Sequence, residues 1–128
     1  RFHEAKEENL NEVSVWGTGK PRRELLYVDD LADGLLHLLE VENPPDWVNM
    51  GTGKDQTIEE LTEVVKEVVG FKGRVINDLS KPDGSPVKRL DVKHMKSLGW
   101  VASTSLVEGV TNTYLDFKGR LKEGSLRL

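Results

Sequence analysis

This chain must cover several apolar helical faces with very few strands, and that imbalance constrains its fold more than any other feature. Leucines recur at helical spacing over 31–39, and a second apolar face runs over 58–69. The stretches with a strand-like pattern are short: 13–16, 24–28, 47–50 and 75–76. This mixture predicts an α/β fold. Because so little sheet cannot bury every helical face, we expect an absent neighbouring domain or self-association as a homodimer.

Capping patterns predict where two helices begin. Thr57 with Glu60, and Ser105 with Glu108, have the spacing of a capping box, in which the first side chain and the acid satisfy each other's backbone amides. Gly70 predicts a left-handed end to the first of these helices. The second is expected to extend to about 117.

Three further helices are predicted from weaker evidence. Asp29 or Asp30 is expected to cap the helix with the leucine face, and Asp91 a short helix that ends at Gly99. Residues 1–11 favour a helix by composition, but they begin without a cap. We therefore expect this first segment to be the end of a longer helix.

The composition excludes several classes of protein. At 128 residues and 14.4 kDa, the chain has the size of one domain. It has no run of about 18 apolar residues that could span a membrane and no apolar signal-peptide core, so we expect a cytoplasmic protein. With no cysteine and three scattered histidines, it shows no metal-ligand pattern. The net charge of -4 argues against a nucleic-acid partner.

The segment WGTGKPRRELLYVDD combines a tight turn with local positive charge. Two glycines permit the turn and three cations follow it: Gly17, Gly19, Lys20, Arg22 and Arg23. Such a turn suits a ligand with a phosphate or carboxylate group. A cation-rich loop that is merely solvated has the same pattern, so the residues alone leave both interpretations open.

Neither glycine turn of the chain carries the dinucleotide-binding fingerprint. That fingerprint places glycines in a turn from a strand into a helix, whose backbone amides bind the pyrophosphate. Gly17-Thr18-Gly19 lies between two expected strands, and Gly51-Thr52-Gly53 lacks the third glycine at the required spacing. We therefore predict no dinucleotide cofactor site in this chain.

Three stretches together resemble one family of nucleotide-sugar enzymes. VWGTGKPRRELLYVDDLA, VNMGTG and KPDGSPVKRLDV are similar to sequences of the GDP-L-fucose synthases, NADP-dependent 3,5-epimerase/4-reductases of the extended short-chain dehydrogenase/reductase superfamily. Many nucleotide-sugar epimerases and dehydratases share the YVDDLA part. WGTG-x-P-x-RE joined to KPDG-S-P-x-K-x-LDV is much more specific to the fucose synthases. The resemblance runs from residue 1 to about 117.

The resemblance implies the C-terminal, substrate-binding part of such an enzyme, with its glycine-rich Rossmann half absent. It assigns 1–118 to a substrate-binding domain and 119–128 to a polar tail that frays. The complete enzyme epimerises GDP-4-keto-6-deoxy-D-mannose at C3 and C5 and reduces its C4 ketone with NADPH. Its catalytic serine and Tyr-x-x-x-Lys helix have no counterpart here. Tyr114 lies four residues before Lys118, but it is expected to be core packing. The chain alone is therefore expected to be catalytically incompetent.

The resemblance also implies five substrate-binding residues: Arg1, Trp16, Arg23, Asp83 and Lys88. The first two would approach the GDP-sugar, and Arg23 would bind its diphosphate region, because a guanidinium can donate two hydrogen bonds to phosphate oxygens. Lys88 would add a point charge and Asp83 an acceptor for ribose hydroxyls or guanine N–H groups.

Structural roles stay open beside these functional ones. Trp16 at a strand end is equally typical of a core, Asp83 before Gly84 can simply hold a turn, and Arg1 can be disordered. Several positions differ from residues frequent in the family, which affects fine substrate contacts: Arg22, Tyr27 and Val87. We expect the histidines to be surface or helix-packing residues: His3, His37 and His94.

Two rival functions remain open at this stage. The chain can be a residual module that binds a sugar nucleotide weakly, since half of the pocket is missing. Alternatively, it can be a non-catalytic interaction protein that associates through the apolar face of 31–39 or of 58–69.

Overall fold

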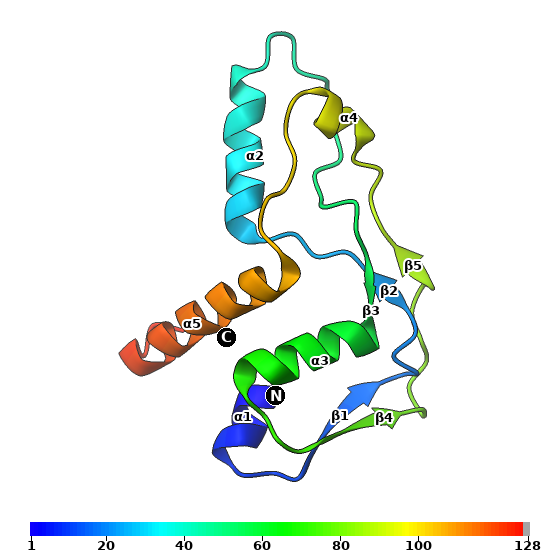
Figure 1. Ribbon diagram of the computed structural model, residues 1–128, viewed down its shortest axis with the longest axis vertical. Coiled ribbons are helices and arrows are strands. Elements are labelled where there is room, and N and C mark those ends of the chain that lie inside the picture. Colours follow the sequence, from blue (N-terminus) through cyan, green and yellow to red (C-terminus); the bar gives the residue numbers. More distant parts are fainter. Residues whose placement is uncertain (127–128) are drawn as a thin grey trace.

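The computed structural model describes residues 1–126 and shows a mixed α/β chain (Figure 1). Its elements occur in the order α1 (Phe2–Glu7), β1 (Glu12–Trp16), β2 (Arg22–Arg23), α2 (Val28–Glu40), β3 (Gln56–Thr57), α3 (Ile58–Val69), β4 (Arg74–Asp78), β5 (Val87–Lys88), α4 (Lys93–Ser97) and α5 (Leu106–Glu123). In Figure 1 the molecule is elongated, with α2 and α4 at one end and α1, β1 and β4 at the other. The α/β class expected from the sequence is confirmed.

Two small sheets organise the chain. Strands β1 and β4 are parallel, with Val13 opposite Val75. The second sheet has the order β3-β2-β5, in which β2 is antiparallel to β3 and parallel to β5. Within it Arg23 lies opposite Lys88. These short ladders place the cationic turn after β1 beside the loop between β4 and β5.

Two predicted strands are wrong. No strand forms over 24–28: the strand in this region, β2, ends at Arg23, and Tyr27 is already the N-cap of α2. The strand expected over 47–50 does not form, and Trp47 is 80% exposed. A strand needs a backbone partner along its whole length. In the first run only the Glu24 amide has one on another strand within residues 1–126, Lys88 O at 3.2 Å, before the chain turns into α2.

The strongest helix prediction is confirmed in detail. Thr57 Oγ1 accepts a hydrogen bond from the Glu60 backbone amide at 3.0 Å, and the Glu60 carboxylate accepts one from the Thr57 amide at 2.7 Å. Gly70 ends α3 with a φ of 77°. At α5, Ser105 accepts from the Glu108 amide at 3.3 Å, so that N-cap is also confirmed.

Other predicted helix boundaries need correction. The N-cap of α2 is Tyr27 rather than Asp29 or Asp30, and no side chain caps it. Val92, not Asp91, is the N-cap of α4, although Asp91 accepts a hydrogen bond from the Lys93 amide at 3.0 Å. The first helix ends at Glu7 instead of residue 11.

The C-terminal segment differs from the tail expected over 119–128. Helix α5 continues through Gly119 to Glu123, and Gly124 ends it with a φ of 65°. The fraying of this segment stays a prediction, and residues 127–128 of the expected tail lie outside the described part of the chain.

Helix α2 is attached by one face only. The Asp30 carboxylate is buried and accepts hydrogen bonds from Ser103 and Thr104, and Trp100 Nε1 donates to Asp33 Oδ2 at 2.9 Å. Gly34 permits this close approach, since a β-carbon there would lie 3.0 Å from the Trp100 ring. This set of polar contacts docks α2 against the segment before α5.

The apolar core is small, as the scarcity of sheet predicts. Ala5, Val13 and Phe71 form a buried cluster, against which Phe2 packs. Along the outer face of α2, large apolar side chains stay exposed, including Leu36 at 64% and Leu39 at 84%. The expectation that the chain leaves an apolar helical face uncovered is therefore confirmed, while the partner that would cover it stays a prediction.

Candidate functional site

The turn after β1 has the tight geometry that its glycines predict. Gly17 and Gly19 have φ values of 76° and 78°, a region that side chains rarely adopt. The Gly17 amide donates to Asp78 O at 3.0 Å, and Asn77 Nδ2 donates to Gly17 O at 2.9 Å. These contacts fix the turn to the end of β4, so β2 starts from a defined position.

Arg22, the first residue of β2, is neutralised within the chain. Its Nε donates to Asp55 Oδ1 at 2.7 Å and its Nη2 to the Asp55 carbonyl at 2.9 Å. The hydrogen bond to Asp55 raises the pKa of this guanidinium, although desolvation opposes the shift. The Asp55 side chain is only 9% exposed and also lies 3.7 Å from Arg89. Arg22 is thus an internal ion-pair residue.

Arg23, the next residue, has no acidic partner among residues 1–126. Its Nη1 donates to two carbonyls, Arg22 O at 2.6 Å and Ser85 O at 2.8 Å. Lys88, exposed, lies opposite Arg23 in the β2–β5 ladder, and paired strands are about 5 Å apart. The structure therefore brings two of the predicted site residues together as adjacent cations.

Asp83 fixes the loop between β4 and β5 to the turn before β2. Its two carboxylate oxygens accept from the Thr18 amide at 2.8 Å and from Thr18 Oγ1 at 2.7 Å. The Thr18 hydroxyl and amide together lower the pKa of Asp83. Gly84 then lies close to Arg23, since a β-carbon there would be 3.0 Å from Nη2. The turn-holding role is thus present, and a ligand contact by Asp83 stays a prediction.

Arg1 and Trp16 form a second group at the end of β1. The Trp16 side chain is 60% exposed, so it is not a core residue. The guanidinium carbon of Arg1 lies 5.7 Å from the centre of its ring, and Lys81 Nζ lies 5.6 Å from it. Sequence reasoning missed Lys81, although it begins the KPDGSP motif. The turn at 17–21 joins this aromatic group to Arg23 and Lys88.

The second glycine turn, Gly51-Thr52-Gly53, is occupied by a side chain of the same protein. The Gly53 amide donates to Glu24 Oε1 at 2.7 Å. The first amides of the helix that follows, α3, are also satisfied: those of Ile58 and Glu59 by Pro21 O and Gly19 O, and that of Glu60 by the Thr57 side chain. The first turn, at Gly17, lies between two strands. Neither turn thus matches the strand-to-helix turn of the dinucleotide fingerprint, and the lack of a dinucleotide site in this chain stays a prediction.

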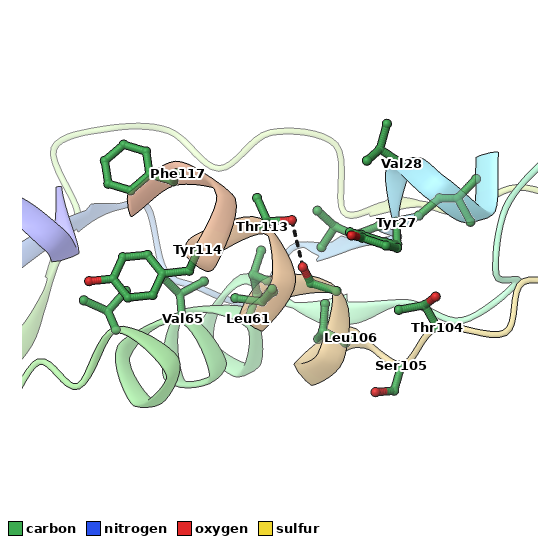
Figure 2. A pocket seen from close by; sticks show the side chains of 15 residues that line it. Tyr27, Val28, Leu61, Val65, Thr104, Ser105, Leu106, Thr113, Tyr114 and Phe117 are labelled. Atoms are coloured by element: carbon green, nitrogen blue, oxygen red, sulfur yellow. Dashed lines mark hydrogen bonds between the residues drawn. The ribbon is translucent and has the colours of Figure 1, made fainter. Parts of the chain in front are cut away.

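A cavity of about 600 Å³ lies between α3, α5 and the start of α2 (Figure 2). Apolar side chains of α3 and α5 line it, among them Leu61, Val65 and Phe117. Tyr114 also lines it, and its hydroxyl lies 3.0 Å from His3 Nδ1. Burial raises the pKa of Tyr114. Tyr114 and His3 are thus packing residues between α5 and α1, as predicted.

The described residues show neither a metal-ligand group nor a membrane-spanning helix. Residues 1–126 contain no group of three or more histidine, cysteine or acidic side chains arranged to hold a metal ion. No helix in that range is both long and apolar enough to cross a membrane. The predicted helix-packing role of His37 is confirmed, because its Nε2 donates to Leu98 O at 2.8 Å.

Comparison with known sequences finds relatives that this chain matches over part of their length. A family described as "NAD dependent epimerase/dehydratase family" matches residues 1–51. The chain is 52% identical to GDP-L-fucose synthase 1 of Arabidopsis thaliana over 114 residues, covering 89% of this chain and 35% of that protein. It is 47% identical to the GDP-L-fucose synthase of Escherichia coli (strain K12) over 123 residues, covering 89% of this chain and 38% of that protein. The chain thus spans roughly a third of the length of these relatives.

Solved structures show the same fold. A GDP-L-fucose synthetase from Naegleria fowleri matches with a TM-score of 0.81 at 23% identity, over 94% of this chain and 37% of that chain. The GDP-mannoheptose C4 reductase of Campylobacter jejuni, solved with NADP bound, matches with a TM-score of 0.77 at 32% identity, over 91% of this chain and 42% of that chain. The protein is a homologue, over part of their length, of the GDP-L-fucose synthases of the NAD dependent epimerase/dehydratase family.

Proposed function

We propose that this chain is the GDP-sugar-binding, C-terminal part of a GDP-L-fucose synthase. One observation carries the proposal: Arg23 lies opposite Lys88 with no acidic partner among residues 1–126. Two cations on adjacent strands suit a diphosphate, because charge-assisted hydrogen bonds to phosphate oxygens are stronger than neutral ones. The specificity of the sequence relationship supports a guanine nucleotide.

The remaining predicted residues have roles that fit this ligand. Trp16 offers an exposed flat face for a sugar or base, and Arg1 and Lys81 lie beside that face. Asp83 holds the loop that leads to β5 and Lys88, and it can accept a further hydrogen bond, since a carboxylate has about four lone-pair sites. The ligand would thus extend from the aromatic group to the paired cations.

In the complete enzyme this part would serve epimerisation of GDP-4-keto-6-deoxy-D-mannose and reduction of its C4 ketone by NADPH. We expect the chain alone neither to bind NADP nor to catalyse the reduction. The only Tyr-x-x-x-Lys spacing in the sequence joins Tyr114 to Lys118, and the Tyr114 hydroxyl contacts His3 instead of facing Arg23 and Lys88. Oxidation of NADPH by the purified chain with the keto-sugar would contradict this expectation.

Calorimetric titration with GDP tests the binding site. We expect saturable binding that weakens at least tenfold in Arg23→Ala, which corresponds to about 1.4 kcal/mol. Lys72→Ala is the matched control, because it removes one exposed positive charge from the loop between α3 and β4. This control variant is expected to bind GDP as the wild type does.

UDP distinguishes a guanine nucleotide site from a general diphosphate site. We expect weaker binding of UDP than of GDP to the wild type. Absence of heat with GDP at millimolar concentration would refute the proposed function. Equal losses in Arg23→Ala and Lys72→Ala would show that only overall charge attracts the nucleotide.

A second candidate function rests on the uncovered face of α2. Leu35, Leu36 and Leu39 are all more than half exposed, and Trp47 beyond them is 80% exposed. This face suits either the missing Rossmann half or a second copy of the chain in a homodimer. Sedimentation equilibrium decides the second case: a dimer that Leu39→Glu converts to a monomer supports it, and a wild-type monomer at high concentration contradicts it.

A further inference from the structure

We infer that Glu24 is a positioning residue that holds Arg23 and Lys88 in place for an anionic ligand. This inference rests on the proposed nucleotide-binding function and adds a residue to that site. It also gives a role to the Gly51-Thr52-Gly53 turn, which fits no dinucleotide.

The Glu24 carboxylate joins three segments that are distant in sequence. Its Oε1 accepts from the Gly53 amide at 2.7 Å and from Thr52 Oγ1 at 3.3 Å, and its Oε2 accepts from the Leu90 amide at 2.7 Å. The Glu24 amide donates to Lys88 O at 3.2 Å. One residue thus connects the end of β2 with the glycine turn and with the segment after β5.

These hydrogen bonds fix the neighbours of Glu24 on both strands. Arg23 precedes Glu24 on the chain, and Lys88 lies between the Ser85 carbonyl that Arg23 binds and the Leu90 amide that Glu24 binds. The carboxylate is held by amides and a hydroxyl alone, since Glu24 forms no ion pair within residues 1–126. Its role is therefore to hold backbone segments instead of to neutralise a cation.

Glycine at position 51 makes room for this contact. A β-carbon at Gly51 would overlap Glu24 Oε1, so the carboxylate reaches its donors only because the side chain is absent. The φ of Gly51 lies outside the left-handed region, so alanine is compatible with its backbone. Gly51→Ala therefore displaces the carboxylate while keeping its charge.

Two variants separate positioning from simple electrostatics. Glu24→Gln removes a negative charge near the site, so an electrostatic role alone predicts tighter GDP binding. A positioning role predicts weaker binding, because the glutamine NH₂ group would face an amide donor. We expect GDP binding to weaken about tenfold in Glu24→Gln and in Gly51→Ala. Glu59→Gln, which removes an exposed acid from α3, is the charge-matched control and is expected to bind as tightly as the wild type or more tightly.

Amide NMR spectra of the free proteins test the positioning without a ligand. We expect Gly51→Ala to shift the amide resonances of Arg23 and Lys88. We expect Glu24→Gln to shift that of Lys88; Arg23 is not used for this variant because it adjoins residue 24 in sequence. Far-UV circular dichroism and thermal melting confirm that each variant is folded, and either variant alone suffices if the other does not fold.

The outcomes are distinguishable. Failure of the wild type to bind GDP overturns the proposed function, and the free-protein spectra then decide the positioning on their own. Unchanged Arg23 and Lys88 resonances overturn the inference, as does tighter GDP binding by Glu24→Gln. Weaker GDP binding together with shifted resonances in a folded variant supports it.

Discussion

Arg22 and Arg23 are adjacent in sequence and on the same strand, yet their side chains have different partners. Arg22 is bound to the Asp55 carboxylate at 2.7 Å, whereas Arg23 donates only to the Arg22 and Ser85 carbonyls. Successive side chains on a strand point to opposite faces, so one arginine faces the acid before β3 and the other faces the loop before β5. The residue type is the same, and its place in the ladder decides its hydrogen-bond partners.

The comparison teaches where charge is available for a ligand. A guanidinium that already binds a carboxylate contributes to the fold, while one bound to neutral carbonyls keeps its full charge for an incoming anion. Substitutions on the two faces should therefore separate into effects on stability and effects on binding.

Removing Asp55 should have the largest effect and should fall on stability. Asp55→Ala leaves two arginines without their nearly buried partner. We expect the free energy of unfolding to fall by about 2 kcal/mol, because a hydrogen bond to a charged group contributes about 1.5–3 kcal/mol. Chemical denaturation monitored by circular dichroism measures the change.

Arg23→Ala tests the face of β2 opposite to the one that Arg22 and Asp55 occupy. It should lower the free energy of unfolding by about 1 kcal/mol, less than Asp55→Ala does, because this half-buried side chain donates only to neutral carbonyls. If Arg23→Ala destabilises the chain as much as Asp55→Ala does, Arg23 is needed for the fold as Arg22 is, and the proposed contrast between the two faces of β2 is wrong.

Asp30 provides a buried acid to compare with Asp55, because its carboxylate accepts hydrogen bonds from Ser103 and Thr104 instead of pairing with a cation. Burial opposes its ionisation, but hydrogen bonds from Thr104 and Ser103 outweigh this and lower the pKa of Asp30. Asp30→Asn should reduce the free energy of unfolding by about 1–2 kcal/mol near neutral pH, because an amide NH₂ cannot accept these bonds.

The pH dependence of that difference has a defined sign. A lowered pKa means that ionised Asp30 stabilises the fold above its ordinary pKa of 3.8, and that this contribution is lost as the pH falls through the lower folded-state value. The stabilities of wild type and Asp30→Asn should therefore converge below pH 3.8. A difference that stays constant in acid would contradict the role of the ionised carboxylate.

Lys88 should have the smallest of these effects. Because it is exposed, Lys88→Ala should weaken GDP binding about threefold, or about 0.6 kcal/mol, within the range of surface charge pairs. The wild-type affinity should also decrease with added salt, which screens exposed charges. A larger loss in Lys88→Ala than in Arg23→Ala would reverse their assigned importance.

Local features of this fold could be predicted from the sequence, and features that depend on distant residues could not. The Thr57 and Ser105 caps and the Gly70 stop were predictable, because each is decided within a few residues. Asp30 was misassigned as a cap, since its donors come from residues 103 and 104. The two-residue strands β2, β3 and β5 are too short for a hydrophobic pattern.

The same distinction holds for the candidate site. The glycine turn and the cations were evident in the sequence, but the neutralisation of Arg22 depends on Asp55, which lies 33 residues away. Glu24 was missed for the same reason, because its partners at 52, 53 and 90 come together only in the folded chain. The glutamate in the WGTG-x-P-x-RE motif was the one available indication.

The central claim, that a guanine nucleotide binds at the Arg23 face of β2, is tested most directly by mapping amide NMR shifts during a GDP titration of the full chain. The account predicts that the shifting resonances cluster at 16–23 and 83–88. Shifts confined to the cavity residues of α3 and α5, or no shifts at millimolar GDP, would contradict it.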